Sequence, residues 1–279
     1  MAEPPMPTLP EIQNLKSKLD EAAVESAFEG AKSPVDHVVL PMGHLDADEG
    51  VVYNQAVLSE ITGVEEDMLT SRSVPMIQRI NMVLANCVKS LSSGTGKVIT
   101  GQAEIFKIVR SLPIADRTFL TFALRRLSLG DDFGFSVDCD SCSNKLKKVV
   151  NLGDLVVEQA PEPAKRVYDL KLPSGKTARW KVGDGLGEEK MSKLILSRQD
   201  KDMMTRSIET RLLELDGKPA SYSQIRSLTL RDRNALRQDF DAKEGGIDAS
   251  VGVACEHCGT LFDAVVGIGT EGFFFPARN

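Results

Sequence analysis

The stretch Val137-Asp138-Cys139-Asp140-Ser141-Cys142 has a counterpart later in the chain, Val253-Ala254-Cys255-Glu256-His257-Cys258. Each stretch ends in a Cys-x-x-Cys pair, and the longer segments 109–142 and 225–258 align around them without a gap, at a constant offset of 116 residues. The aligned identities include Arg110/Arg226, Ser111/Ser227, Leu112/Leu228, Asp116/Asp232, Arg117/Arg233, Leu120/Leu236, Gly130/Gly246, Asp132/Asp248 and the cysteines themselves. One Cys-x-x-Cys pair supplies half of a four-cysteine metal site, so two pairs on related copies predict a complete site.

The composition is that of a soluble globular protein. The chain has 279 residues, of which 42% are hydrophobic and 27% are charged, and this length allows two medium-sized domains. No apolar run approaches the roughly 20 residues that span a bilayer, and the start, Met1-Ala2-Glu3-Pro4-Pro5, lacks the regions of a signal peptide. We therefore expect a reducing, cytosolic origin, where paired cysteines are metal ligands more often than disulfides.

The net charge of −6 argues against a general nucleic-acid-binding protein, because phosphate contacts need a surplus of Lys and Arg. A local basic run, Lys145, Lys147 and Lys148, follows the first cysteine pair, and no similar run follows the second. We interpret this run as the solvated face of a strand.

Residues 1–35 differ from the rest of the chain. Several prolines are followed by Ile12, Leu15 and Leu19 at helical spacing, and Gly30 and Pro34 end the expected helix. Two interpretations of this partly helical N-terminal arm remain open: a mobile tail, and an arm that lies on a neighbouring subunit.

Each copy is expected to contain a β-hairpin, then helices, then a cysteine-bearing hairpin. The expected first strands are 38–41 and 51–58 in one copy and 170–173 and 178–182 in the other. The expected helices are 63–69, 76–88 and 116–127, with counterparts at 186–191, 203–213 and 232–240. The predicted fold is therefore α+β with a tandem duplicated domain: the arm at 1–35, repeat 1 at 36–158, a linker at 161–164 and repeat 2 at 165–279.

A strand, a Cys-x-x-Cys turn and a second strand form one arm of a zinc ribbon. The expected ligands of a structural Zn²⁺ are Cys139, Cys142, Cys255 and Cys258. Because 112 residues separate the two pairs, one shared ion would join the two repeats, and its removal would loosen their orientation. Two alternatives stay open: a lost metal site, and redox or disulfide chemistry. A thioredoxin-type dithiol needs a thiolate at a helix N-terminus, whereas both pairs lie between strand-like segments.

Other motifs receive structural interpretations. Gly94–Lys97 lacks the spacing of a phosphate loop and is expected to link two helices, and Asp46–Gly50 is expected to be a hairpin turn. Cys87 lies on an apolar stripe and is expected in the core. His257 is able to tune or replace a ligand, but an exposed position is expected. Phe273–Phe275 either completes the core of repeat 2, the preferred interpretation, or inserts into a partner.

No catalytic residue is predicted, because no Ser/His/Asp set or paired-carboxylate motif can be picked out.

The run from Leu124 to Phe133, Leu-Arg-Arg-Leu-Ser-Leu-Gly-Asp-Asp-Phe, is followed by the first cysteine pair and by Asn151-Leu152-x-Asp154-Leu155. This combination resembles a family of bacteriophage tail baseplate proteins, similar to the T4 baseplate hub assembly protein and found in contractile-tailed phages. The resemblance is good over 38–157, weaker over 167–276, and does not include the arm.

Departures from the family pattern surround the cysteines. Asp140, Ser141 and Ser143 stand where many members have Pro and Gly, and Glu256 and His257 stand within the second pair. These departures put the metal affinity in doubt and leave all four thiols in place.

The resemblance implies a non-enzymatic structural or assembly protein of a contractile phage tail baseplate or hub. Its location would be the virion tail baseplate, or the host cytoplasm during assembly. Its partners would be other baseplate and tail proteins in a multi-subunit assembly, with neither a membrane nor a nucleic acid expected. The alternatives are a zinc-ribbon nucleic-acid-binding module and a dithiol enzyme.

Overall fold

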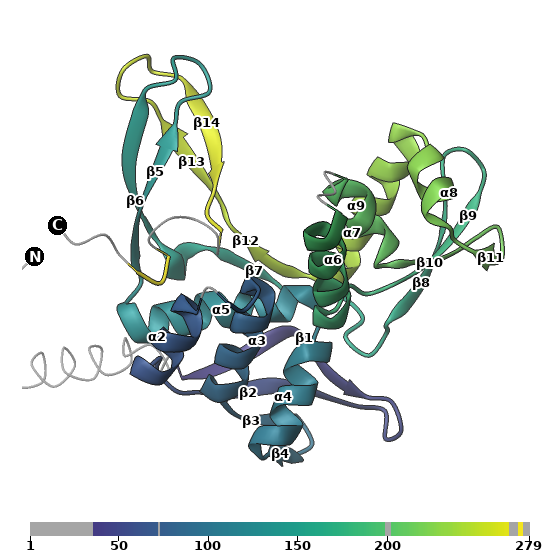
Figure 1. The fold of residues 1–279 in the computed structure, drawn as a ribbon, viewed down its shortest axis with the longest axis horizontal. Helices are drawn as coiled ribbons and strands as arrows, with labels where there is room; N and C mark the ends of the chain where they lie inside the picture. Colours follow the sequence, from purple (N-terminus) through teal and green to yellow (C-terminus); the bar gives the residue numbers. More distant parts are fainter. Residues whose placement is uncertain (1–35, 72, 199–201, 268–272, 276–279) are drawn as a thin grey trace, which may run out of the picture. The chain divides into compact units, whose positions relative to one another are not determined.

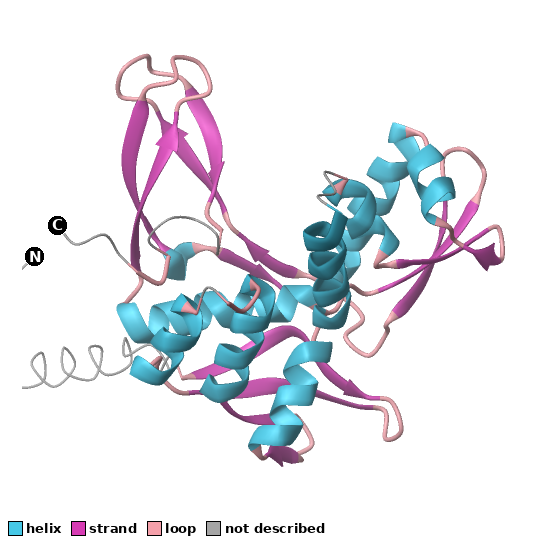
Figure 2. Cartoon of the chain, in the orientation of Figure 1, coloured by secondary structure: helices cyan, strands magenta, loops and turns pink. Residues whose placement is uncertain are grey.

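The computed structural model describes residues 36–71, 73–198, 202–267 and 273–275 (Figure 1). The expected N-terminal arm lies outside these residues. Within them, helices and antiparallel strands are mixed along the chain, so the protein is α+β, as predicted (Figure 2). No helix in this part of the chain is both long enough and apolar enough to cross a membrane.

The first four-stranded sheet has the order β1-β2-β3-β4. Its strands and helices are β1 (His37–Asp46), β2 (Val51–Leu58), α2 (Gly63–Thr70), α3 (Met76–Cys87), β3 (Val88–Ser93), β4 (Val98–Thr100), α4 (Gln102–Ser111) and α5 (Ile114–Leu129). Thr62 begins α2 in a capping box with Glu65. The core between sheet and helices is aliphatic, with Leu40, Leu91 and Leu120 fully buried.

The second four-stranded sheet follows the same succession, with the order β8-β9-β10-β11. Its elements are β8 (Val167–Lys171), β9 (Thr177–Lys181), α6 (Gly185–Arg198), α7 (Met203–Glu209), β10 (Leu212–Leu215), β11 (Lys218–Pro219), α8 (Tyr222–Ser227) and α9 (Leu230–Glu244). Trp180 lies at the centre of its core, with ring centroids 4.9 Å from Tyr168 and 4.6 Å from Phe240. The indole N–H donates to Asp239 Oδ2 at 2.8 Å, so the one polar atom of this buried ring is satisfied.

Two further hairpins carry the cysteine pairs and follow α5 and α9 (Figure 1). They are β5 (Asp132–Asp138) with β6 (Lys145–Asn151), and β13 (Ser250–Ala254) with β14 (Leu261–Val265). Apolar residues from both hairpins form one shared core cluster. After the short 3-10 helix η1 (Leu152–Asp154), β7 (Val156–Glu158) pairs with β12 (Gly246–Asp248). A strand that follows the first hairpin therefore pairs with a strand that precedes the second hairpin.

The aligned aspartates Asp116 and Asp232 occupy the third position of α5 and of α9 and make matching contacts. Asp116 accepts hydrogen bonds from the backbone N–H groups of Met42 and Gly43 at 2.8 and 2.7 Å. Asp232 accepts from the backbone N–H of Ser174 at 3.0 Å. In each case the carboxylate ties the first strand of the preceding sheet, or the turn after it, to the N-terminus of the last helix.

The aligned arginines that follow also make matching contacts. Arg117 Nη1 donates to the carbonyl oxygen of Val109 at 2.9 Å, and Arg233 Nη1 donates to that of Ile225 at 3.3 Å. Val109 and Ile225 are themselves separated by the same offset of 116 residues. Each arginine thus joins the last helix of its set to the helix before it.

Helix α6 packs on helices α3, α4 and α5 of the first sheet. Arg110 donates two hydrogen bonds to Glu189, at 2.7 and 2.8 Å, and Asn81 Nδ2 donates to the same carboxylate at 2.7 Å. Arg117 Nε lies 3.0 Å from Glu188 Oε2. Because Glu189 and Arg117 are buried, each charge depends on its partner, and the junction specifies one arrangement of the two sheets.

The structure corrects three local expectations. The helix expected over 76–88 ends at Cys87, and Val88 begins strand β3. The helix expected over 203–213 ends at Glu209, and Leu212 and Leu213 lie in strand β10. Gly94–Lys97 is therefore the turn of the β3–β4 hairpin, not a helix–helix loop. The apolar spacing was compatible with a longer helix, but pairing with β2 and β9 decided the strands.

The phenylalanine run near the C-terminus packs differently from the preferred expectation. Phe273 is 2% exposed and makes edge contacts with Phe122 and Phe133, at centroid distances of 5.0 and 5.5 Å. These rings belong to α5 and β5, so Phe273 does complete a core, but it is the core cluster that the two hairpins share and not the core of the second sheet. Asp46–Gly50 forms the expected turn between β1 and β2.

Candidate metal centre

The turn at the end of the β5–β6 hairpin holds the first cysteine pair. The backbone N–H of Cys139 donates to the carbonyl oxygen of Asn144 at 3.0 Å, and the N–H of Ser143 donates to that of Cys139 at 2.9 Å. Ser143 has a φ of 58°, which is uncommon for a residue with a side chain. The turn therefore closes tightly around the two thiols.

The turn of the β13–β14 hairpin has the same hydrogen bonds. The N–H of Cys255 donates to the carbonyl oxygen of Thr260 at 2.9 Å, and the N–H of Gly259 donates to that of Cys255 at 2.9 Å. Gly259 has a φ of 75°, a conformation that glycine adopts without strain. The two cysteine turns thus share their backbone pattern residue by residue.

The structure brings all four predicted sulfur atoms together. The Sγ atoms of Cys139 and Cys258 are 3.7 Å apart, as are those of Cys142 and Cys255, and all four lie within 4.8 Å of one another. A tetrahedron with Zn–S bonds of about 2.3 Å has S···S edges of about 3.8 Å, whereas a disulfide requires about 2.0 Å. The four thiols are free and could hold a metal ion of this size.

The pairing across the site is symmetric. The first cysteine of each turn lies nearest the second cysteine of the other, so the offset of 116 residues converts one close pair into the other. Cys139 and Cys255 are 2% and 3% exposed and belong to the shared hairpin core. Cys142 and Cys258 are exposed. One side of the cluster is therefore packed against protein, and the other faces solvent.

The thiols differ in how readily they ionise. Burial raises the pKa of Cys255 to about 11, whereas the hydrogen bond with the Thr260 hydroxyl lowers the pKa of Cys258 to about 6. A shared cation favours the thiolate form of every ligand. The donor set, four sulfurs at tetrahedral spacing, suits Zn²⁺ better than the oxygen-preferring Mg²⁺ or Ca²⁺.

The remaining cysteine and the nearby histidine stay outside the cluster. Cys87 is 1% exposed in the first core, as predicted, and burial raises its pKa to about 12, so it is not a reactive thiol. His257 is exposed, as predicted. Neither cysteine pair lies at the N-terminus of a helix, the location that activates dithiols of the thioredoxin type.

An ion pair crosses between the hairpins close to the sulfur cluster. Lys148 of β6 contacts Glu256, which lies between the two cysteines of the second turn. Sequence reasoning assigned Lys148 to a solvated strand face and did not foresee this partner. At the offset of 116, Glu256 aligns with the acidic Asp140 but Lys148 aligns with Ala264, so the alignment does not repeat the ion pair and carried no signal for it.

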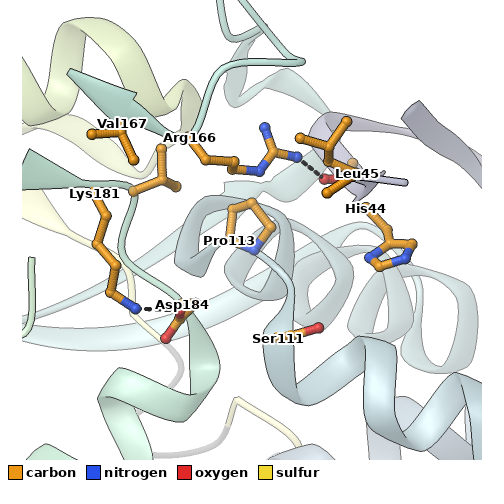
Figure 3. Close-up of a pocket in the computed structure, with 11 residues that line it drawn as sticks. His44, Leu45, Ser111, Pro113, Arg166, Val167, Lys181 and Asp184 are labelled. Atoms are coloured by element: carbon orange, nitrogen blue, oxygen red, sulfur yellow. Dashed lines mark hydrogen bonds and ion pairs between the residues drawn. The ribbon is translucent and has the colours of Figure 1, made fainter. Parts of the chain in front are cut away.

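A cavity of about 320 Å³ lies away from the cysteines, between β1, the start of α5 and strands β8 and β9 (Figure 3). Its charged groups already have partners: Arg166 Nη2 donates to the carbonyl oxygen of Gly43 at 2.7 Å, and Lys181 pairs with Asp184 at 2.7 Å. The cavity is therefore explained as a gap at the junction of the two sheets, because its Arg166 and Lys181 side chains already bind protein groups there.

A family model described as T4 bacteriophage base plate protein matches residues 51–274, which is most of the chain. Comparisons with curated proteins and with solved structures gave no significant match. The match includes strands β2 to β4 of the first sheet, the whole second sheet, both cysteine turns and Phe273, and begins after strand β1. On this evidence the chain belongs to the T4 bacteriophage base plate protein family.

Proposed function

We propose that this protein is a structural or assembly component of a contractile phage tail baseplate or of its hub, and that it acts through contacts with other baseplate and tail proteins. The family match over residues 51–274 carries the proposal. The cysteine cluster supports it, because free thiols at tetrahedral spacing are explained by a structural metal without any reaction. The role is thus architectural, not catalytic.

The proposed architecture is a tandem duplication, with repeat 1 at 36–158 and repeat 2 at 165–279. Its support is the common order of strands in the two sheets, the matching backbone pattern of the two cysteine turns, and the matching contacts of the Asp-Arg pairs at 116–117 and 232–233. Contacts that recur at one constant offset are expected when both copies descend from one unit.

The proposed ligands of a structural Zn²⁺ are Cys139, Cys142, Cys255 and Cys258. Bound there, the ion would supply four metal–thiolate bonds that join the ends of the two hairpins. The protein supplies the backbone turns that converge the sulfurs and the apolar core that buries two of them. Such a site would join the two repeats into one unit within the assembly.

A gene disruption in the phage that encodes the chain tests the role in the tail. We expect normal heads, and tails that lack a complete baseplate, with infectivity restored by the gene supplied in trans. Coexpression with the other baseplate proteins of the same phage should give a complex of defined stoichiometry. Normal, infective particles from the disrupted phage would overturn the proposal.

Protein analysis of purified virions then separates the two forms of the role. A resident component is found in the mature baseplate at a fixed copy number. An assembly factor is found in baseplate intermediates and is missing from virions.

The zinc-ribbon nucleic-acid alternative receives no support from the first hairpin. Lys145 and Lys147 are exposed, but Lys145 pairs in register with Asp138, and its aligned position in the second hairpin is Leu261. A filter-binding measurement at low salt is expected to show no retention of DNA or RNA, and salt-dependent retention would favour the alternative.

A further inference from the structure

The exposed cysteines of the cluster lack the packing that fixes the buried ones. Cys139 and Cys255 are held by the shared hairpin core, whereas Cys142 and Cys258 face solvent. A ligand side chain on a surface turn has free rotamers, so its sulfur needs another contact to stay at a tetrahedral position. The structure provides such a contact at both cysteines.

One residue in each turn lies two positions after the exposed cysteine and contacts its sulfur. Asn144 Nδ2 donates to Cys142 Sγ at 3.4 Å, and the Thr260 hydroxyl lies 3.3 Å from Cys258 Sγ. Asn144 and Thr260 are separated by the same offset of 116 residues. The side chains differ, but each places a polar group against the outward-facing sulfur: the Asn144 amide donates to Cys142 Sγ, and the Cys258 thiol donates to the Thr260 hydroxyl, which can in turn donate to a metal-bound sulfur.

The same two residues also bind the buried cysteines through their backbones. The carbonyl oxygen of Asn144 accepts from the N–H of Cys139, and that of Thr260 accepts from the N–H of Cys255. Each residue therefore contacts both cysteines of its turn, one through the main chain and one through the side chain. This double contact fixes the spacing of the two sulfurs in a way that a residue bound only through its backbone does not.

We propose that Asn144 and Thr260 are positioning residues that hold the Cys142 and Cys258 sulfurs in place and so set how long the metal ion is retained at the exposed side of the site. The proposal rests on the zinc site proposed above. Groups that hydrogen-bond to metal ligands commonly change metal affinity by about 10- to 100-fold when they are removed.

The test uses the full chain and four variants: Thr260→Val, Asn144→Leu, the double variant, and Thr260→Ser as the matched control. Valine keeps the shape of threonine without the hydroxyl, and serine keeps the hydroxyl. Zn²⁺ release to a chromogenic chelator gives the dissociation rate. Co²⁺ substitution gives the sulfur-to-metal charge-transfer absorption, which reports the sulfur geometry directly.

We expect release about 3- to 10-fold faster in each single donor-lacking variant and about 10- to 100-fold faster in the double variant, with a shifted or weakened charge-transfer band. Thr260→Ser should behave as the wild type. The metal-free variants should unfold at the same urea concentration as the metal-free wild type, because Asn144 is exposed and Thr260 half-buried.

Wild-type release rates and spectra in the double variant would overturn the positioning role while leaving the zinc site intact. Equal losses in Thr260→Ser and Thr260→Val would also overturn it, since the hydroxyl would then be irrelevant. A wild-type chain that binds neither Zn²⁺ nor Co²⁺ would instead remove the zinc site itself, and the inference with it. The exposed single variants keep the test available if the double variant misfolds.

Discussion

At the scale of single residues, Asp116 and Asp232 both accept hydrogen bonds from backbone N–H groups of the preceding sheet or its turn, but in different surroundings. Both side chains are enclosed, at 0% and 1% exposed. Burial raises the pKa of Asp116 to about 7. The hydrogen bonds from Met42 and Gly43 act in the opposite direction and are outweighed, and both donor residues are themselves buried. For Asp232 burial also acts against ionisation, but hydrogen bonds from Ser174 and Thr229 dominate and lower the pKa. Ser174 and Thr229 are exposed, whereas Met42 and Gly43 are buried.

Opposite pKa shifts predict opposite dependences of stability on pH. The folded pKa of Asp116 lies above the value near 3.9 in the unfolded chain, so its contribution is fully present below about pH 4 and is lost as pH rises through about 7. We expect Asp116→Asn to lower the free energy of unfolding, relative to the wild type, by more at pH 5 than at pH 7.5, as measured by urea unfolding. The contribution of Asp232 is present at neutral pH and lost on acidification below its usual pKa. Carboxyl carbon NMR titration checks both directions, and equal pKa values for the two residues would contradict the account.

The aligned arginines predict unequal losses of stability. Arg117 is 3% exposed and pairs with Glu188, so Arg117→Met leaves a partly buried carboxylate without its hydrogen-bonded partner. Arg233 has neutral partners, the carbonyl oxygen of Ile225 and the hydroxyl of Thr205, at 3.3 and 3.2 Å. We expect a loss of about 3 kcal/mol or more for Arg117→Met and about 1 kcal/mol for Arg233→Met. Urea unfolding of the two variants measures the difference, and equal losses would show that the ion pair adds nothing.

The site was more predictable than its supports. A Cys-x-x-Cys pair is recognisable from its spacing in the sequence. The repeat predicted that the sulfurs of Cys139, Cys142, Cys255 and Cys258 would lie together, and the structure places them together. Asn144 and Thr260 share no chemistry visible in an alignment, so only the folded turns reveal their common contact. The Lys148–Glu256 pair joins residues 108 apart and depends on how the two hairpins lie against each other.

At the scale of elements, hairpins were easier to predict than the strands that follow helices. The turn at Asp46–Gly50 and the strands around each cysteine pair carry their own local signals. Strand β3 directly follows helix α3, and strand β10 begins shortly after helix α7 ends. No proline or glycine separates helix from strand in either place. Val88 and Leu212 continue the apolar spacing of the preceding helix by one more position, so their sequence is compatible with a longer helix. They are in strands because they pair with β2 and β9. Long-range pairing therefore supplied what local periodicity lacked.

Metal removal is expected to act on two elements and to spare the rest. We expect hydrogen exchange at the turn amides of Cys139, Ser143, Cys255 and Gly259 to accelerate when a chelator is added, because their hydrogen bonds are then held only by the hairpins. Amides of β1 to β4 should keep their protection. The Cys142→Ser/Cys258→Ser variant is the control and should exchange rapidly with or without chelator. Unchanged exchange in the wild type would argue that the thiols hold no ion.

At the scale of the whole molecule, the junction between the sheets depends on close backbone approach at the start of α6. Gly185 donates its N–H to the carbonyl oxygen of Leu112 at 3.2 Å. A Cβ atom there would lie 2.7 Å from the carbonyl oxygen of Arg110 and 2.7 Å from the guanidinium carbon of Arg117. Glycine is therefore required for the helix to come this close to α4 and α5.

Gly185→Ala is expected to cost about 1–3 kcal/mol and to uncouple the sheets. Trp180, the one tryptophan of the chain, reports on the second sheet, so its fluorescence should then change at a different urea concentration from the circular dichroism. Gly187→Ala is the matched control, because its Cβ would lie 3.2 Å from a side-chain oxygen of Asp184 and alanine favours helix. Coincident transitions in Gly185→Ala, with a stability equal to that of the control, would contradict this interpretation.

The distance along the chain between the two cysteine turns also orders events in time. Cys142 leaves the ribosome 113 residues before Cys255, which at about 5–20 residues per second is roughly 6 to 23 s. During that interval the first turn has only two thiols and no companion hairpin, while the first sheet has all its strands. The shared hairpin core also contains Ala264, Val266 and Phe273, so it can close only after translation has passed Phe273, and until Cys258 has emerged the first cysteine turn has no partner thiols.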